Sequence, residues 1–174
     1  MRLTDKVAII TGGGSGFGEV TGHLFAREGA AVMLADIDGA AARTVAESIT
    51  AEGGRGGVVI NVSSVAVLVG LQNMSAYCAA KGAIIALTRA MGADFAPHGI
   101  RVNCIAPGTA MTPLGQRLIE NDTPEKLAQR LSRYPLGRFA QPEEIARSVL
   151  FLASDDSSYA TGMCLVMDGG LTCV

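Results

Sequence analysis

A glycine-rich turn close to the N-terminus constrains the fold more than any other feature of the sequence. Residues 7–11 form a short apolar run, residues 12–18 read Gly-Gly-Gly-Ser-Gly-Phe-Gly, and apolar side chains then recur at helical spacing as far as Gly29. A second apolar run at 31–35 and a second helical pattern at 42–49 follow. The segment therefore predicts a βαβα unit, whose strands pair in parallel through right-handed crossovers.

The rest of the chain continues this alternation of strands and helices. A stripe of apolar residues marks one face of the longest predicted helix, namely Ile84, Leu87, Met91 and Phe95. Further strands are predicted at 58–62, 100–105 and 163–167, and further helices at 77–96, in two short pieces within 112–140, and at 142–153. We expect an α/β fold with a parallel sheet in one domain, residues 1–174, with a βαβα half at 1–55 and a second half at 56–174.

Composition narrows the classes of function. The 174 residues are 49% hydrophobic, which suits a packed core, and the net charge of −2 offers no basic surface for nucleic acid. No apolar run approaches the ~18 residues of a membrane span, and no signal peptide is recognisable, so we expect a cytoplasmic protein without a membrane partner. The cysteines and histidines lack the spacing of a metal site or a disulfide framework, so we predict no metal and reduced, packing thiols at Cys78, Cys104, Cys164 and Cys173.

The glycine turn is a candidate phosphate site, because glycines let backbone N–H groups at a helix N-terminus approach an anion. Its spacing is Thr11-Gly12-x-x-x-Gly16-x-Gly18 and does not fit the common G-x-G-x-x-G pattern. The candidate cofactor contacts here are Gly12, Ser15, Gly16, Phe17 and Gly18. The alternative interpretation is a tight turn with no ligand.

Asp36 closes the second predicted strand, 18 residues after Gly18. An acid at about this offset accepts hydrogen bonds from an adenosine ribose and repels a 2′-phosphate, which favours NAD over NADP. Ile37 beside it is a further candidate contact. The alternatives are a solvated acid at a strand end, or Asp38 in the role of the acid.

Tyr77 and Lys81 stand four residues apart at the start of the longest predicted helix and so share a face. A tyrosine hydroxyl keeps its proton at neutral pH, and a nearby ammonium stabilises the phenolate and eases proton transfer to or from an alcohol oxygen. Ser64, thirteen residues before Tyr77, could hydrogen-bond the same oxygen. Alone, such a pair is more commonly an ordinary surface pair.

Four motifs together resemble the short-chain dehydrogenase/reductase family. They are Thr11-Gly-Gly-Gly-Ser-Gly-Phe-Gly18, Asn61-Val-Ser-Ser64, Tyr77-Cys-Ala-Ala-Lys81 and Pro107-Gly-Thr109, in the family's order. The resemblance implies a Rossmann-like, doubly wound parallel sheet. It also implies a homo-oligomer, either a dimer or a tetramer.

The same resemblance implies an NAD-dependent interconversion of a secondary alcohol and a ketone. In it, Ser64 positions the substrate oxygen, Tyr77 is the general acid and base, and Lys81 binds the nicotinamide ribose and tunes the tyrosine. A loop flanks the nicotinamide, and the helices after it, within 109–140, form a substrate lid. The matching loop residues are Pro107, Gly108, Thr109 and Thr112.

The chain is shorter than this family, whose members have about 250 residues in one domain. The shortfall of roughly 70 residues falls between Ala51 and Val58, where the family has its third and fourth strands. The family's Asn-Asn-Ala-Gly turn does not occur in the sequence. We expect a sheet without those two strands, with unpaired backbone groups at its centre unless the halves pair or another chain fills the gap.

Two other functions stay open. The first is an internally deleted, catalytically inactive relative that acts at most as a binding or interaction module. The second, another nucleotide-binding α/β enzyme such as a methyltransferase, gives Tyr77 and Lys81 no role and is disfavoured.

Overall fold

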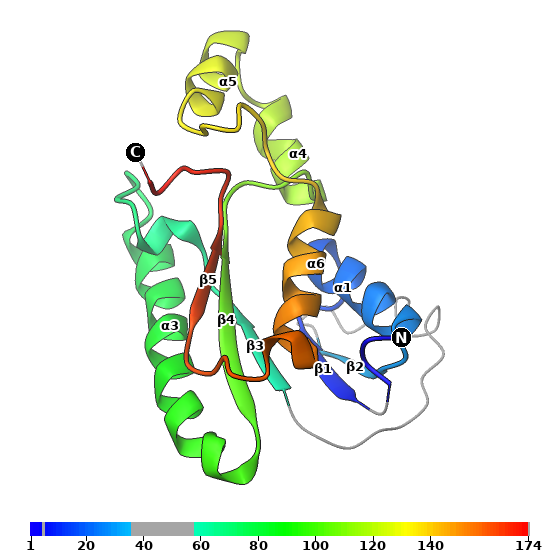
Figure 1. Cartoon of the computed structure of the whole chain (residues 1–174). Helices are drawn as coiled ribbons and strands as arrows, with labels where there is room; N and C mark the ends of the chain where they lie inside the picture. The colour runs from blue at the N-terminus through cyan, green and yellow to red at the C-terminus, as the bar shows by residue number, and fades with distance from the viewer. Residues whose placement is uncertain (5, 36–57, 174) are drawn as a thin grey trace.

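A computed structural model describes residues 1–4, 6–35 and 58–173 as an α/β fold (Figure 1). The predicted helix at 42–49 and the candidates Asp36 and Ile37 lie outside the described residues. The elements in chain order, with η for a 3-10 helix, are β1 (Val7–Thr11), α1 (Gly16–Arg27), β2 (Ala31–Ala35), β3 (Val58–Val62), η1 (Val65–Val67), α3 (Ser75–Phe95), η2 (Ala96–His98), β4 (Arg101–Pro107), α4 (Pro113–Glu120), α5 (Pro124–Leu131), α6 (Pro142–Ala153), η3 (Asp155–Ser157) and β5 (Cys164–Met167).

All described strands pair in parallel, as the sequence predicts. β1 pairs with β2, in a register that sets Val7 opposite Ala31. The second sheet has the order β3-β4-β5, with Val58 opposite Arg101 and Cys104 opposite Cys164. The predicted helix and strand positions hold within two residues at each end, and the segment after β4 contains the two short helices α4 and α5.

The sheet is in two pieces among the described residues, because β1 and β3 are not hydrogen-bonded to each other. Cα atoms of the two strands approach within 8 Å. Paired strands lie about 4.8 Å apart, and two strands with a third between them lie about twice as far apart. An approach within 8 Å therefore leaves no room for a third strand between β1 and β3. The Rossmann-like class is therefore confirmed, as is a sheet that lacks central strands among the described residues; there the two halves have not paired to close the gap.

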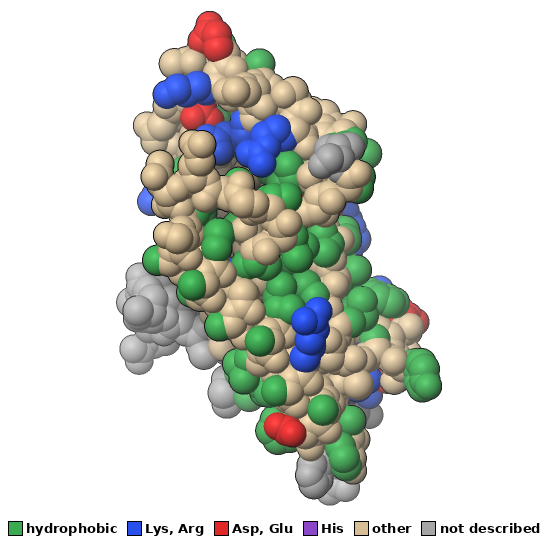
Figure 2. Space-filling view, turned by 90° about the vertical axis from the view of Figure 1, so that its left-hand side faces the viewer, with side chains coloured by type: hydrophobic (Ala, Val, Ile, Leu, Met, Phe, Trp, Pro, Cys, Tyr) green, Lys and Arg blue, Asp and Glu red, His purple; other side chains and the backbone are tan. Residues whose placement is uncertain are grey.

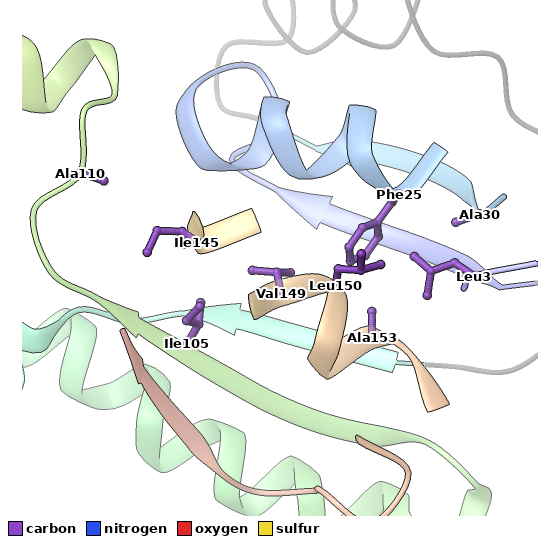
Figure 3. Close-up of a cluster of buried hydrophobic side chains, with 9 residues drawn as sticks. All are labelled: Leu3, Phe25, Ala30, Ile105, Ala110, Ile145, Val149, Leu150 and Ala153. Carbon is purple, nitrogen blue, oxygen red and sulfur yellow. The ribbon is translucent and has the colours of Figure 1, made fainter. Parts of the chain in front are cut away.

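An apolar core joins the two pieces in place of strand pairing. Helix α6 lies between the β1–β2 unit and the β3–β4–β5 sheet, and its side chains point toward both (Figure 3). Phe25 from α1 and Ile105 from β4 are both buried in this core, together with Leu3, Ala30, Ala110, Ile145, Val149, Leu150 and Ala153. We call the space between β1 and β3 the seam. It is lined by the four consecutive residues 8–11 of β1 and by alternate residues of β3, namely Val58, Ile60 and Val62.

The face of helix α3 that packs on the sheet carries small side chains. It is not the face marked by the apolar stripe in the sequence. Leu87 and Phe95 are 53% and 38% exposed, whereas Thr88 and Gly92 are buried. A Cβ on Gly92 would lie 2.8 Å from the Cα of Gly162, so only glycine permits this approach. Thr88 accepts a hydrogen bond from the side chain of Asn61, at 2.9 Å. Periodicity located the helix, but close packing decided which face is buried.

Arg101, at the start of β4, forms hydrogen bonds with the C-terminal end of α6. Its guanidinium donates hydrogen bonds to the carbonyl oxygens of Leu152, at 2.8 Å, and Ser154, at 3.0 Å. Both carbonyls lie at the C-terminal end of α6, where they also accept bonds from the Ser157 hydroxyl, and the cation complements the helix dipole. Burial lowers the pKa of Arg101 from its ordinary value. No helix in the described part of the chain is long and apolar enough to span a membrane.

Candidate active site

The glycine turn adopts a conformation that its glycines require. Gly12 and Gly16 have φ of +70° and +57°, in the left-handed region that residues with a Cβ rarely adopt. A Cβ on Gly18 would lie 1.9 Å from the carbonyl oxygen of Gly12, so the first turn of α1 packs directly on the loop. Ser15 precedes α1 as its N-cap residue and is exposed.

This turn fits the phosphates of a nucleotide. A Cβ on Gly12 would meet nothing within 4 Å, so that side of the loop is open. The N-terminus of α1, a helix of 12 residues, faces the same turn and favours an anion. A Cβ on Gly16 would lie 3.4 Å from Cγ2 of Thr112, which places the turn against the loop that follows β4. The fold thus brings predicted cofactor residues from the two halves together.

Ser64, Tyr77 and Lys81 line one cleft with the loop at 107–112. Ser64 follows β3 by two residues and caps η1, whose Ala66 donates its N–H to the serine hydroxyl oxygen at 3.2 Å. This bond orients the hydroxyl and leaves its proton for a substrate oxygen. Tyr77 projects from the first turn of α3 and is 42% exposed.

Lys81 lies one helical turn after Tyr77 and is anchored to the sheet. Its ammonium donates a hydrogen bond to the carbonyl oxygen of Val62, the last residue of β3, at 3.0 Å. The Nζ atom lies 5.9 Å from the centroid of the Tyr77 ring. Burial lowers the pKa of Lys81 from its ordinary value. A cation held at this place can stabilise negative charge on the tyrosine oxygen.

The buried side chain of Tyr134 holds the loop after β4 by hydrogen bonds. The Tyr134 hydroxyl donates a hydrogen bond to Oγ1 of Thr109 at 2.9 Å and accepts one from the N–H of Thr109 at 3.2 Å. A Cβ on Gly108 would lie 3.1 Å from the Cα of Asp168, so the loop packs tightly on the end of β5. Thr112 ends the loop as the N-cap of α4 and accepts a bond from the N–H of Gly115.

Asp168 stabilises the segment on which this loop rests. Its carboxylate accepts bonds from the N–H groups of Gly170, at 2.9 Å, and Thr172, at 2.8 Å. Burial raises the pKa of Asp168, but the bonds from Thr172 and Gly170 outweigh it, so the pKa lies below its ordinary value. The site thus rests on loops that the C-terminal half holds in place.

Sequence reasoning missed three residues of this region. Tyr134 is buried beneath the loop, and Arg130 and Arg133 line the cleft. No motif marks Tyr134, whose role depends on a contact 25 residues away. The arginines have one signal, because residues three apart at the end of a predicted helix share a face.

The cleft as a whole is large enough for a small molecule and combines apolar walls with polar groups. It holds about 1150 Å³, counting its open mouth, and Phe17, Pro107 and Leu114 supply apolar walls. A positioned serine, a tyrosine and an ammonium can hold an oxygen atom and move its proton. The open glycine turn on the adjacent helix can hold the phosphates of a nucleotide.

Comparisons with protein families agree over the two halves of the chain. Residues 46–172 match the family described as enoyl-(acyl carrier protein) reductase. Residues 6–56 match the family described as short chain dehydrogenase. The two matches meet in the segment where the sequence predicts the shortfall.

Individual relatives match either part of the chain or nearly all of it. A stretch of 120 residues is 52% identical to 2-(S)-hydroxypropyl-CoM dehydrogenase 3 of Xanthobacter autotrophicus, covering 68% of this chain and 47% of that protein, so this match spans about half of the relative's length. A match to cyclohexanol dehydrogenase of an Acinetobacter species is 30% identical over 249 positions, covering 98% of this chain and 96% of that protein. The chain has only 174 residues, so at least 75 of the 249 aligned positions are gaps in this chain.

A solved structure supports the fold and the family. A short chain dehydrogenase/reductase family protein superposes over 100% of this chain, with a TM-score of 0.86 and 26% sequence identity. Family implies a nicotinamide cofactor, and the open glycine turn fits one. The sequence matches, the fold and the clustering of Ser64, Tyr77 and Lys81 lead to one conclusion: the chain belongs to the short-chain dehydrogenase/reductase family.

Proposed function

We propose that this chain is an NAD-dependent oxidoreductase that interconverts a secondary alcohol and a ketone. The observation that carries the proposal is the shared cleft of Ser64, Tyr77 and Lys81, with the glycine turn packed against its 107–112 loop. Relatives named as dehydrogenases of hydroxypropyl-CoM and of cyclohexanol support it, because both names describe oxidation of an alcohol.

Tyr77 is proposed as the general acid and base. In the direction of oxidation its phenolate oxygen takes the proton of the substrate hydroxyl, and the Lys81 ammonium, anchored on Val62, stabilises that phenolate. The Ser64 hydroxyl donates to the same substrate oxygen, since its own oxygen already accepts from Ala66. The bound nicotinamide would supply the acceptor for the hydride that leaves the substrate carbon.

The cofactor is proposed to be NAD, held by residues of both halves. Gly12, Ser15, Gly16, Phe17 and Gly18 would hold the pyrophosphate, and Pro107, Gly108, Thr109 and Thr112 would flank the nicotinamide. The preference over NADP rests on Asp36 and Ile37, the two residues that follow Ala35 in the sequence. The partners are a small alcohol or ketone and further copies of the chain.

A second candidate is an inactive relative, which one observation favours. The described strands form two separate sheets, and relatives carry at least 75 positions that this chain lacks. A displaced β1–β2 unit would hold a cofactor out of line with Tyr77. Such a chain would bind ligands weakly and turn over none.

Formation of NADH tests the proposal against this alternative. We expect purified, folded chain to reduce NAD with at least one member of a panel of secondary alcohols. Tyr77→Phe removes only the hydroxyl, so it should abolish this activity while the protein stays folded. Folded wild-type chain that oxidises no alcohol in the panel, or a fully active Tyr77→Phe variant, would overturn the proposal.

A further inference from the structure

Among the described residues that line the active-site cleft, all the charged side chains are cations. Its lining includes Lys81, Arg130 and Arg133 and contains neither Asp nor Glu, although the whole chain has a net charge of −2. Lys and Arg side chains gather near the top of the face shown in Figure 2, where α5 lies. Cations that line a cleft concentrate anions within it, because apolar walls focus their field.

Two of the three cations are held by other groups. Lys81 donates to the Val62 carbonyl beside Tyr77. Arg130, in the last turn of α5, forms a two-point ion pair with Asp122, with its Nε 2.8 Å from Oδ2 and its NH2 3.2 Å from Oδ1. The pair fixes the direction of the Arg130 guanidinium and offsets part of its charge.

Arg133 is the cation that the fold itself does not use. It lies two residues beyond α5, and three residues after Arg130. Of the ion pairs formed by the described residues, none includes Arg133. An arginine that lines a cleft without a carboxylate partner is suited to a ligand, because its planar guanidinium binds carboxylate, sulfonate or phosphate at two points.

We propose that Arg133, supported by Arg130, binds an anionic group on the substrate, so that the preferred substrates are secondary alcohols bearing a carboxylate, sulfonate or phosphate. This inference rests on the proposed oxidoreductase function. Both arginines come from the lid segment and line the same cleft as Ser64 and Tyr77. The anion would therefore fix one end of the substrate while Ser64 and Tyr77 hold the reacting oxygen at the other.

The cofactor pyrophosphate is the competing ligand for these arginines. The glycine turn and the N-terminus of α1 already supply N–H groups for that pyrophosphate. An NAD titration of Arg133→Ala separates the two roles. We expect its Kd for NAD to equal that of the wild type, and a rise of tenfold or more would assign Arg133 to the cofactor and overturn the inference.

Matched alcohols test the substrate role directly. Each anionic alcohol is compared with a neutral secondary alcohol of equal chain length, and the ratio of their kcat/KM values is measured. We expect the ratio to fall about tenfold or more in Arg133→Ala, since removal of a charge-assisted bond costs more than 1.4 kcal/mol. Arg133→Lys should keep part of the preference. The three anions form separate arms of the panel, which identifies the head group.

Two further variants sharpen this test. Arg117→Ala is the matched control, because Arg117 lies on α4 of the same lid and does not line the cleft; its ratio should equal that of the wild type. Asp122→Asn removes the carboxylate that competes for Arg130, so it should lower KM for the anionic alcohols several-fold. An equal fall in the ratio for Arg117→Ala would show a general charge effect and overturn the inference.

Binding without turnover keeps this inference separate from the proposed function. Calorimetry of an anionic ketone, added to chain saturated with NAD, should show binding that Arg133→Ala weakens about tenfold or more. If this holds while no alcohol is oxidised, the anion site stands and the oxidoreductase function fails. If neutral alcohols are oxidised and the anion confers no advantage in the wild type, the function stands and the anion site is refuted.

Discussion

The two pieces of the sheet differ in how much of each is buried. In the three-stranded piece, the central strand β4 is buried along nearly its whole length, and Val102 and Ile105 have no exposed surface. In the two-stranded piece, Ile9 of β1 is 61% exposed. The C-terminal piece also positions Ser64, Tyr77 and Lys81, whereas the N-terminal piece contributes the glycine turn. The proposed catalytic residues therefore lie on the well-packed piece, and the proposed phosphate site lies on the more exposed one.

This difference follows from the missing strands. Relatives aligned from end to end carry at least 75 positions that this chain lacks. Without them β1 and β3 have unpaired edges at the seam, and among the described residues the pieces are linked by apolar packing through α6 and by the surface ion pairs Arg2–Asp156 and Lys6–Asp155. Hydrophobic contact is non-directional, so it joins the pieces without fixing their register as strand hydrogen bonds would.

The largest expected effect separates the two pieces by burial. Ile105→Ala should lower the free energy of unfolding by about 2–5 kcal/mol, because it leaves a cavity beneath α6. Ile9→Ala should change it by no more than about 0.5 kcal/mol, since that side chain is largely exposed. Urea unfolding of both variants measures the contrast. Equal losses would show that the seam is closed and that Ile9 is buried in solution.

A smaller loss is expected at the end of α6, the helix shared by both pieces. Arg101→Ala should cost about 2 kcal/mol of unfolding free energy, since carbonyl oxygens of Leu152 and Ser154 lose a charged donor. Arg117→Ala on α4 is the control and should be neutral, because this side chain is exposed. Denaturant midpoints compare the two, and a neutral Arg101→Ala would refute the role of this anchor.

The next effect concerns the more exposed piece and the proposed cofactor. Gly18→Ala should weaken NAD binding at least tenfold, about 1.4 kcal/mol, because a Cβ would clash with the carbonyl oxygen of Gly12. Gly70→Ala meets nothing within 4 Å and should bind NAD as the wild type does. Calorimetric titration reads out both. Unchanged affinity in Gly18→Ala would place the pyrophosphate elsewhere.

The smallest effect is a pH dependence at the start of α6. The side chain of Arg138 and the N–H of Gln141 hold the pKa of Glu144 at about 2, below its ordinary 4.5. A lowered pKa means that the ionised form stabilises the fold fully above pH 4.5 and loses this effect as the pH falls toward 2. Wild type and Glu144→Gln should therefore converge in thermal stability over this interval. A constant difference down to pH 2 would contradict it.

The sequence predicted local structure better than it predicted the relation between the pieces. Periodicity and turn residues located each described β-strand and α-helix, because these signals are short-range, but they did not locate the three 3-10 helices η1, η2 and η3. The burial of Thr88 and Gly92 in place of Leu87 was not foreseeable, since it depends on how closely α3 approaches Gly162. Tyr134 escaped notice for the same reason, because its partner Thr109 is 25 residues away.

The sequence predicted those parts of the candidate site whose residues belong to recognisable motifs. Ser64, Tyr77 and Lys81 lie along one cleft with the 107–112 loop, as their resemblance to the family implies. Their roles, and those of Asp36 and Ile37, stay predictions. The shortfall in length predicted that central strands are missing. It could not predict that β1 and β3 stay unpaired, because this depends on three-dimensional packing.

NAD binding by the intact chain tests most directly whether the two pieces still form one nucleotide site across the seam. Calorimetric titration of chain that unfolds in a single cooperative transition should show saturable binding, with a Kd on the order of micromolar, about −8 kcal/mol. The glycine turn and the 107–112 loop would then act as one site. No detectable binding in such folded protein would contradict the account and favour the inactive relative.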